Sequence, residues 1–227
     1  PFLILATILV VMVVAIARET ILETAIEDQT DERFALDLLR IRPLAGAILI
    51  GVALYVMIGV FDPLWVVMMD DLGAPNWIGN AGVSIFGMPW ILFATVGGAI
   101  AQKYGPFRVS AFGLVIGAFY MAAYGFIGSP YVMLSVAVTQ SALDALTVTG
   151  TGIAVANAAP PQRQAGASGL LGGIQTLTGG VVALAAGSVY EHFGRGVAFG
   201  ATGVAMLSLV CIGCLLAGPK LLRRPNH

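Results

Sequence analysis

The feature that most constrains this chain is a succession of long apolar runs. Seven of them reach the length of about 17–25 residues that a helix needs to cross a bilayer. They occupy residues 1–17, 43–69, 76–101, 107–127, 130–158, 165–190 and 196–218. Because lipid offers the backbone no hydrogen-bonding partners, only helices and closed barrels cross a membrane. Continuous apolar runs, without the alternation of barrel strands, predict an all-α polytopic membrane protein.

The composition agrees with this prediction. Hydrophobic residues make up 58% of the chain and charged residues 10%, whereas a soluble domain carries about 25% charged residues. The sequence has no phosphate-binding loop, metal-ligand cluster or nucleophile triad, so we expect no enzyme, no cofactor, no metal and no nucleic-acid partner. Cys211 and Cys214 lie in the last apolar run. We interpret them as small residues packed in a helix, because a reactive pair needs an electropositive setting.

The longest hydrophilic segment is 18–42, which holds seven of the twelve acidic residues. Its apolar residues recur at helical spacing, which predicts an amphipathic surface helix in a cytoplasmic linker between two helical bundles. A solvated tether is the simpler alternative. The last residues, 219–227, form a basic tail.

The basic residues predict how the chain is oriented in the membrane. If segment 18–42 is cytoplasmic, then so are the turns at 102–108 and 159–164 and the tail after residue 218. These regions hold ten of the eleven Lys and Arg residues, and only Arg195 lies outside them. Since Lys and Arg accumulate in cytoplasmic loops, we expect a multi-pass protein of the plasma (inner) membrane with a cytoplasmic C-terminus.

Two turns share one pattern. Gly98–Gly105 and Gly187–Gly194 both run glycine, branched apolar, polar, basic, aromatic, glycine, and both glycines of the second copy lie 89 residues after those of the first. Three predicted crossings separate the turns, which places them on opposite faces of the membrane. The pattern predicts an inverted three-plus-three repeat of 43–127 and 130–218, giving a six-helix bundle over 43–218.

The apolar run at 1–17 has no place in this six-helix bundle. We expect it to be the last helix of a preceding N-terminal bundle. The chain starts at Pro1 rather than at a methionine, which also favours a longer protein in which the N-terminal six-helix half comes first.

The first turn also carries a family resemblance. Residues 98–108 resemble the loop signature of the major facilitator superfamily, roughly G-x-L-A-D-R-x-G-R-K, at its second-half position between helices eight and nine. The segment contributes Gly98, Ile100, Ala101, Lys103, Gly105 and, at its end, Arg108. Gln102 stands where the family has an aspartate, and Pro106 where a basic residue is usual. In the family this acid supports a charge network at the cytoplasmic face, so the resemblance implies a weaker network here.

The resemblance covers the whole chain as helix six, the central linker and helices seven to twelve. It implies a secondary transporter that works by alternating access, with a substrate cavity between two six-helix halves. The partners it implies are the lipid bilayer, a small-molecule substrate, protons and the N-terminal half of the same chain.

A stripe of polar residues marks segment 130–158. Gln140, Asp144, Thr147 and Thr151 follow i, i+4, i+7 and i+11, which is one helix face. A carboxylate near the middle of a membrane helix costs roughly 2.5–3.5 kcal/mol or more. We therefore interpret Asp144 as a proton-coupling acid or a contact for a cation. The alternative is that it only holds helices together through Gln140, Ser141 or Thr147.

Other segments contribute weaker candidates. Tyr55 and Asp62 are seven residues apart on one face of 43–69, and Pro63 follows Asp62; a capping or hinge role is as good an interpretation as substrate binding. In 165–190, Gln175 is the best polar candidate. In 76–101 one face carries Ser84, Met88, Ile91 and Thr95. We predict that four segments line the cavity, namely 43–69, 76–101, 130–158 and 165–190. Segments 107–127 and 196–218 are predicted to be peripheral.

These residues favour proton-coupled efflux of amphipathic or cationic compounds by a multidrug-type antiporter. Apart from Arg108 at the very start of 107–127, no Lys or Arg lies within an apolar segment of the predicted bundle to hold an anion, whereas two acids, Asp62 and Asp144, lie among Tyr, Gln and Met. One alternative is uptake of a neutral metabolite such as a sugar, with Gln140 and Gln175 bonding its hydroxyls. Another is a transport-inactive subunit of a membrane assembly.

Overall fold

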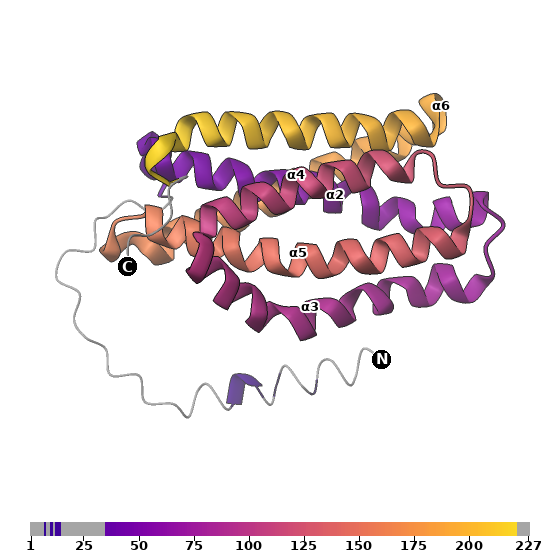
Figure 1. Ribbon diagram of the computed structural model, residues 1–227, viewed down its shortest axis with the longest axis horizontal. Coiled ribbons are helices and arrows are strands. Elements are labelled where there is room, and N and C mark those ends of the chain that lie inside the picture. Colours follow the sequence, from indigo (N-terminus) through magenta and orange to yellow (C-terminus); the bar gives the residue numbers. More distant parts are fainter. Residues whose placement is uncertain (1–6, 8–9, 11, 15–34, 222–227) are drawn as a thin grey trace. The chain divides into compact units, whose positions relative to one another are not determined.

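The computed structural model describes residues 7, 10, 12–14 and 35–221 (Figure 1). The chain divides into two units, Pro1–Glu32 and Arg33–His227. In the first unit the few described residues are helical. The rest of the predicted helix at 1–17, the linker up to residue 34 and the tail from residue 222 lie outside the described residues.

Apart from short connecting turns, the described residues of the second unit are helical. Its elements are η1 (Leu36–Arg40), α2 (Arg42–Asp71), α3 (Asn76–Tyr104), α4 (Pro106–Tyr124), α5 (Pro130–Ala158), η2 (Pro161–Arg163) and α6 (Gln164–Leu221). Proline occupies the first turn of α2, α4 and α5, where its missing N–H needs no partner. The five long helices are all apolar enough to cross a membrane. These observations confirm the prediction of an all-α polytopic membrane protein.

The longest helix, α6, consists of two arms. Gly194 has non-helical angles, φ 82° and ψ 168°, within it. The chain therefore forms one arm over 164–193 and a second that runs from residue 195 to a further break at Gly218, where φ is 72° and ψ 172°; Figure 1 shows the second arm, in yellow, running back along the bundle. With α6 counted as two arms, each of the six apolar segments predicted after residue 42 is helical.

The two repeated turns have related backbone conformations. Gly105, between α3 and α4, has φ 94°, and its counterpart Gly194 has φ 82°. Positive φ is easily reached only by glycine, which explains why glycine ends both copies of the pattern. In Figure 1 the α3–α4 turn and the Gly194 turn lie at opposite ends of the bundle, as an inverted repeat requires.

Helix packing follows the same symmetry. α2 packs against both arms of α6, while α5 packs against α3 and α4. α2 is therefore the most buried of the long helices. Its backbone approaches α6 at two glycines: a Cβ at Gly46 would lie 2.5 Å from the Gly213 oxygen, and one at Gly59 would lie 2.6 Å from the Gly179 oxygen. Small residues permit such close packing of membrane helices.

The turn at Gly194 gives a matched stability test. Gly194→Ala should lower the free energy of unfolding by roughly 1–3 kcal/mol, because an L-residue is strained at this φ. Gly187→Ala is the control, since both glycines belong to α6 and neither would bring a new Cβ within 4 Å of another atom, but only Gly194 has a positive φ. Thermal unfolding of the full chain in detergent measures both, and equal midpoints for the two variants would contradict this account of the turn.

Candidate functional site

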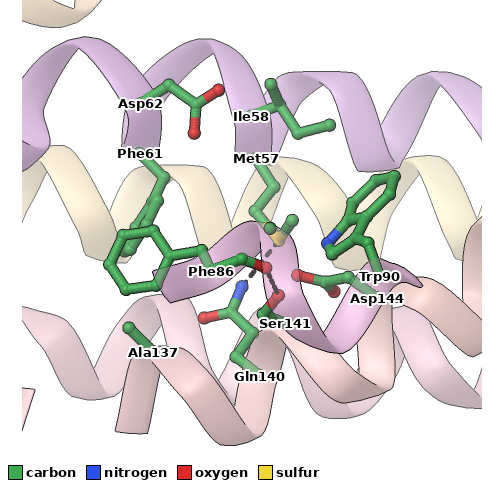
Figure 2. A pocket seen from close by; sticks show the side chains of 11 residues that line it. Met57, Ile58, Phe61, Asp62, Phe86, Trp90, Ala137, Gln140, Ser141 and Asp144 are labelled. Carbon is green, nitrogen blue, oxygen red and sulfur yellow. Dashed lines mark hydrogen bonds between the residues drawn. The ribbon is translucent and has the colours of Figure 1, made fainter. Parts of the chain in front are cut away.

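A cavity of about 230 Å³ lies among α2, α3 and α5 (Figure 2). Three helices contribute its walls. The lining residues are Met57, Ile58, Phe61 and Asp62 of α2, Phe86, Gly87 and Trp90 of α3, and Ala137, Gln140, Ser141 and Asp144 of α5. These are the first helices of the two predicted repeats, α2 and α5, together with the bent helix α3.

One part of the wall is aromatic. The Phe61 and Phe86 rings meet edge to face with centroids 5.6 Å apart, and Trp65 packs edge-on against Phe86 at 4.5 Å. Trp65 is fully buried, and its indole Nε1 donates to the Ile78 carbonyl at 3.4 Å. Edge-to-face geometry of this kind favours a fixed ring orientation. In Figure 2 the Phe61 and Phe86 rings lie toward one end of the cavity and Trp90 toward the other.

The polar part of the wall comes from α5. Gln140 and Asp144 lie one helical turn apart and are 3% and 7% exposed. Gln140 Nε2 donates to Met57 Sδ at 2.8 Å, while Gln140 Oε1 is buried and has no hydrogen-bond partner among the described residues. A buried acceptor without a donor is costly. The cavity therefore presents an unsatisfied carbonyl beside a buried carboxyl group.

The ionisable side chains of the described chain that line the cavity are both carboxyl groups, Asp62 and Asp144. Asp62, exposed at its edge, is close enough to Asp144 for the two carboxylates to repel each other. No Lys, Arg or His of the described chain lines the cavity. A positively charged group entering it would relieve this repulsion.

A cross-helix hydrogen bond fixes α3 against α5 beside the cavity. Ser141 Oγ donates to the backbone carbonyl of Phe86, three residues before Pro89, a proline within α3. Pro89 has no N–H to donate to the carbonyl of Ile85, four residues earlier, which weakens the helix at this turn. Ser or Thr side chains of neighbouring helices commonly bond backbone carbonyls near such a break. Figure 1 shows α3 bent, with its two halves at an angle to each other.

Three of the predicted site residues lie at other helix contacts. Thr147 is buried where α5 meets α4, and its Oγ1 donates to the Leu143 carbonyl at 2.9 Å. Gln175 Nε2, on the first arm of α6, donates to the Gly51 carbonyl of α2 at 3.0 Å. Tyr55 packs against Gly179 of that arm. Of the six predicted residues, the structure brings only Gln140, Asp144 and Asp62 together in the cavity.

Most of the remaining predicted residues are exposed. The face of α3 with Ser84, Met88, Ile91 and Thr95 lies on the surface of the described unit rather than in the cavity. In the signature loop Gly98 and Gly105 bracket the end of α3, and Gln102, Lys103 and Arg108 are exposed there. Lys103 Nζ lies 5.3 Å from the centroid of the Tyr104 ring.

Methionine was expected in the cavity, but the aromatic wall and the particular methionine, Met57, were not predicted. Phe86 and Trp90 are one turn apart and flank Pro89, while Met57 and Phe61 are one turn apart on α2. Aromatic residues at i, i+4 beside an intrahelical proline were the available signal. In a chain where nearly every face is apolar, that signal does not distinguish a cavity wall from a lipid-facing surface.

The sequence was compared with protein families, curated proteins and solved structures. A family model described as Major Facilitator Superfamily matches residues 44–227. Neither the curated proteins nor the solved structures give a match. The family match spans all the long helices α2 to α6 and the signature loop.

The hydrogen bond of Ser141 can be tested with a control in the same helix. Ser141→Ala should lower the free energy of unfolding by about 0.6–1.7 kcal/mol, the range measured for hydrogen bonds between membrane helices. Ser135→Ala should leave it unchanged, because Ser135 is exposed and its Oγ bonds only the Tyr131 carbonyl of its own helix. Thermal unfolding in detergent compares the two variants. If Ser141→Ala lowers the free energy of unfolding no more than Ser135→Ala does, the cross-helix hydrogen bond is ruled out.

Proposed function

The chain belongs to the major facilitator superfamily, and from this premise we propose that it exports amphipathic or cationic compounds in exchange for protons. Membership makes it part of a secondary transporter of small solutes embedded in lipid, rather than an enzyme. The substrate, the direction of transport and the coupling ion are proposed from the cavity.

One observation carries the substrate class. The buried carboxyl group of Asp144 lies with Gln140 Oε1, which has no hydrogen-bond partner in the part of the chain that the structure describes, in a cavity whose other walls are largely aromatic and apolar. A substrate with a cationic N–H group donates a hydrogen bond to Gln140 Oε1 and pairs with the carboxylate of Asp144. Its apolar body would replace water against Phe61, Phe86 and Trp90, and a cation over an aromatic face gains about 0.5–2 kcal/mol.

The same burial supports proton coupling. A carboxylate taken out of water is unstable unless a partner or a proton neutralises it. With no basic side chain lining the cavity in the described chain, Asp144 accepts either a proton or the cationic substrate. Because a proton and the cationic substrate compete for this one carboxyl group, protonation of Asp144 releases the substrate, as antiport requires.

The uptake alternative receives less support from the geometry. It relied on Gln140 and Gln175 jointly binding the hydroxyls of a neutral metabolite. The Gln175 amide instead donates to the Gly51 carbonyl, between α2 and α6. A single glutamine beside two carboxylates in a mostly apolar cavity fits a cation better than a sugar, whose many hydroxyls need many polar partners.

The charges at the ends of the bundle support the proposed orientation. Lys103 and Arg108 are exposed at the α3–α4 turn, while Asp71 and Glu191 are exposed at the opposite end. By the positive-inside rule the α3–α4 turn is cytoplasmic. We extend this to a plasma-membrane protein whose C-terminus is cytoplasmic, and in which an N-terminal half of the same chain closes the cavity from the other side.

The coupling role of Asp144 gives the central functional prediction. Asp144→Asn in the intact transporter should abolish transport of an organic cation driven by an imposed pH gradient, because an amide neither exchanges the proton nor pairs with the cation. Loss of a charge-assisted contact of about 1.5–3 kcal/mol should also weaken cation binding by roughly ten- to a hundred-fold. Proteoliposomes with an imposed gradient measure the first effect and equilibrium binding the second.

The matched control is Asp70→Asn. Asp70 is an exposed carboxylate at the end of α2, outside the cavity, so its removal should leave gradient-driven transport near the wild-type rate. Unchanged transport by Asp144→Asn would exclude the coupling role. An intact, folded chain that transports no member of a panel of cations, anions and neutral solutes would instead favour the inactive-subunit alternative.

A further inference from the structure

A second hollow lies on the outside of the bundle, between α4 and the second arm of α6. Its volume is about 450 Å³. Tyr104 and Arg108 lie at one end of it, and its apolar sides include Phe112 and Val115 of α4 and Val210 and Cys214 of α6. None of these residues belongs to the cavity among α2, α3 and α5.

This groove lies on a lipid-facing surface. Phe112 is 69% exposed and Phe119, further along α4, is 64% exposed. On the second arm of α6, Ile212 and Leu215 are also exposed. Large apolar side chains exposed on helices that cross a membrane contact acyl chains rather than water. The groove is therefore open to the bilayer, and the molecules that reach it first are lipids.

One end of the groove is cationic. Arg108 is exposed in the first turn of α4, and Lys103 lies nearby, over the ring of Tyr104. No carboxylate of the described chain lines the groove, so nothing in it offsets the charge of Arg108. The helix N-terminus adds positive potential at the same position. The end of the groove at the membrane surface thus attracts an anion.

The groove has the dimensions for a lipid chain. Arg108, Phe112 and Val115 follow i, i+4 and i+7 on one face of α4. At about 1.5 Å per residue the groove runs roughly 10 Å into the hydrocarbon region from Arg108. Val210 and Cys214, one turn apart, form the opposite wall. A charged group at the interface joined to an apolar chain that extends inward is the form of a phospholipid.

We propose that this groove is a binding site for an anionic phospholipid. The phosphate pairs with Arg108 at the end of the groove that Tyr104 also lines, and the first part of one acyl chain lies between α4 and α6. The site is independent of the proposed substrate cavity, because it uses different residues on the outer side of the bundle.

Native mass spectrometry of the full chain in an uncharged detergent tests the proposal. Phosphatidylglycerol and phosphatidylcholine with identical acyl chains are the probes. We expect wild type to retain phosphatidylglycerol about five-fold more tightly than phosphatidylcholine, the effect of one basic residue near an anionic headgroup. Arg108→Gln should abolish this preference. Arg195→Gln should keep it, because Arg195 lies at the opposite end of the bundle and does not line the groove.

Labelling of Cys214 locates the bound lipid in the groove. In a Cys211→Ser background, phosphatidylglycerol should slow the reaction of Cys214 with a membrane-permeant maleimide, and phosphatidylcholine should not. Equal retention of the two lipids by wild type, retained preference in Arg108→Gln or unchanged labelling would each overturn the proposal. An Arg108-dependent dimer without bound lipid would show that the groove is an interface between copies, which also overturns it.

Discussion

The close approach of α2 to both arms of α6 is the contact on which the rest of the bundle depends. In lipid, apolar side chains gain nothing by leaving the solvent, so helices associate through packing at short range. Gly46 and Gly59 allow the α2 backbone to meet the carbonyl oxygens of Gly213 and Gly179. With one side of α2 held in this way, its other side faces α3 and α5, and it is this side that carries Met57, Phe61 and Asp62 into the cavity.

The cavity combines rigidity with a buried polar pair, Gln140 and Asp144. The Phe61, Trp65 and Phe86 rings pack edge-on, and Ser141 ties α5 to the bend in α3. These contacts hold the walls in place around Gln140 and Asp144. A carboxyl group at this depth destabilises the bundle unless something neutralises it. Retaining such a group within fixed walls is consistent with a site that a proton and a cation occupy in turn.

Much of the fold could be predicted from the sequence because a small number of physical rules determines where membrane helices form and where they turn. Apolar length determines the crossings, and the repeated glycines at 105 and 194 mark turns that only glycine tolerates. The pairing of Gln140 with Asp144 also followed from helical spacing. Domain boundaries and membrane orientation stay predictions.

The site could be predicted only in part, because a polar residue in a membrane helix has several ways to be satisfied. Thr147 bonds its own helix and Gln175 bonds the backbone of α2, and periodicity cannot separate these outcomes from cavity lining. The aromatic walls were missed for the opposite reason. An apolar face can meet lipid, another helix or a cavity, and the sequence of a helix that is apolar on every side does not distinguish them.

The claim that Asp144 is where a cation and a proton compete can be tested on the side chain itself. A membrane-permeant carbodiimide reacts with protonated carboxyl groups out of contact with water, and peptide mapping by mass spectrometry locates the adduct. The account predicts that Asp144 is modified and that an organic cation slows its modification, whereas an uncharged compound of the same shape does not. Modification of Asp144 at the same rate with and without a cation that the protein transports would contradict it.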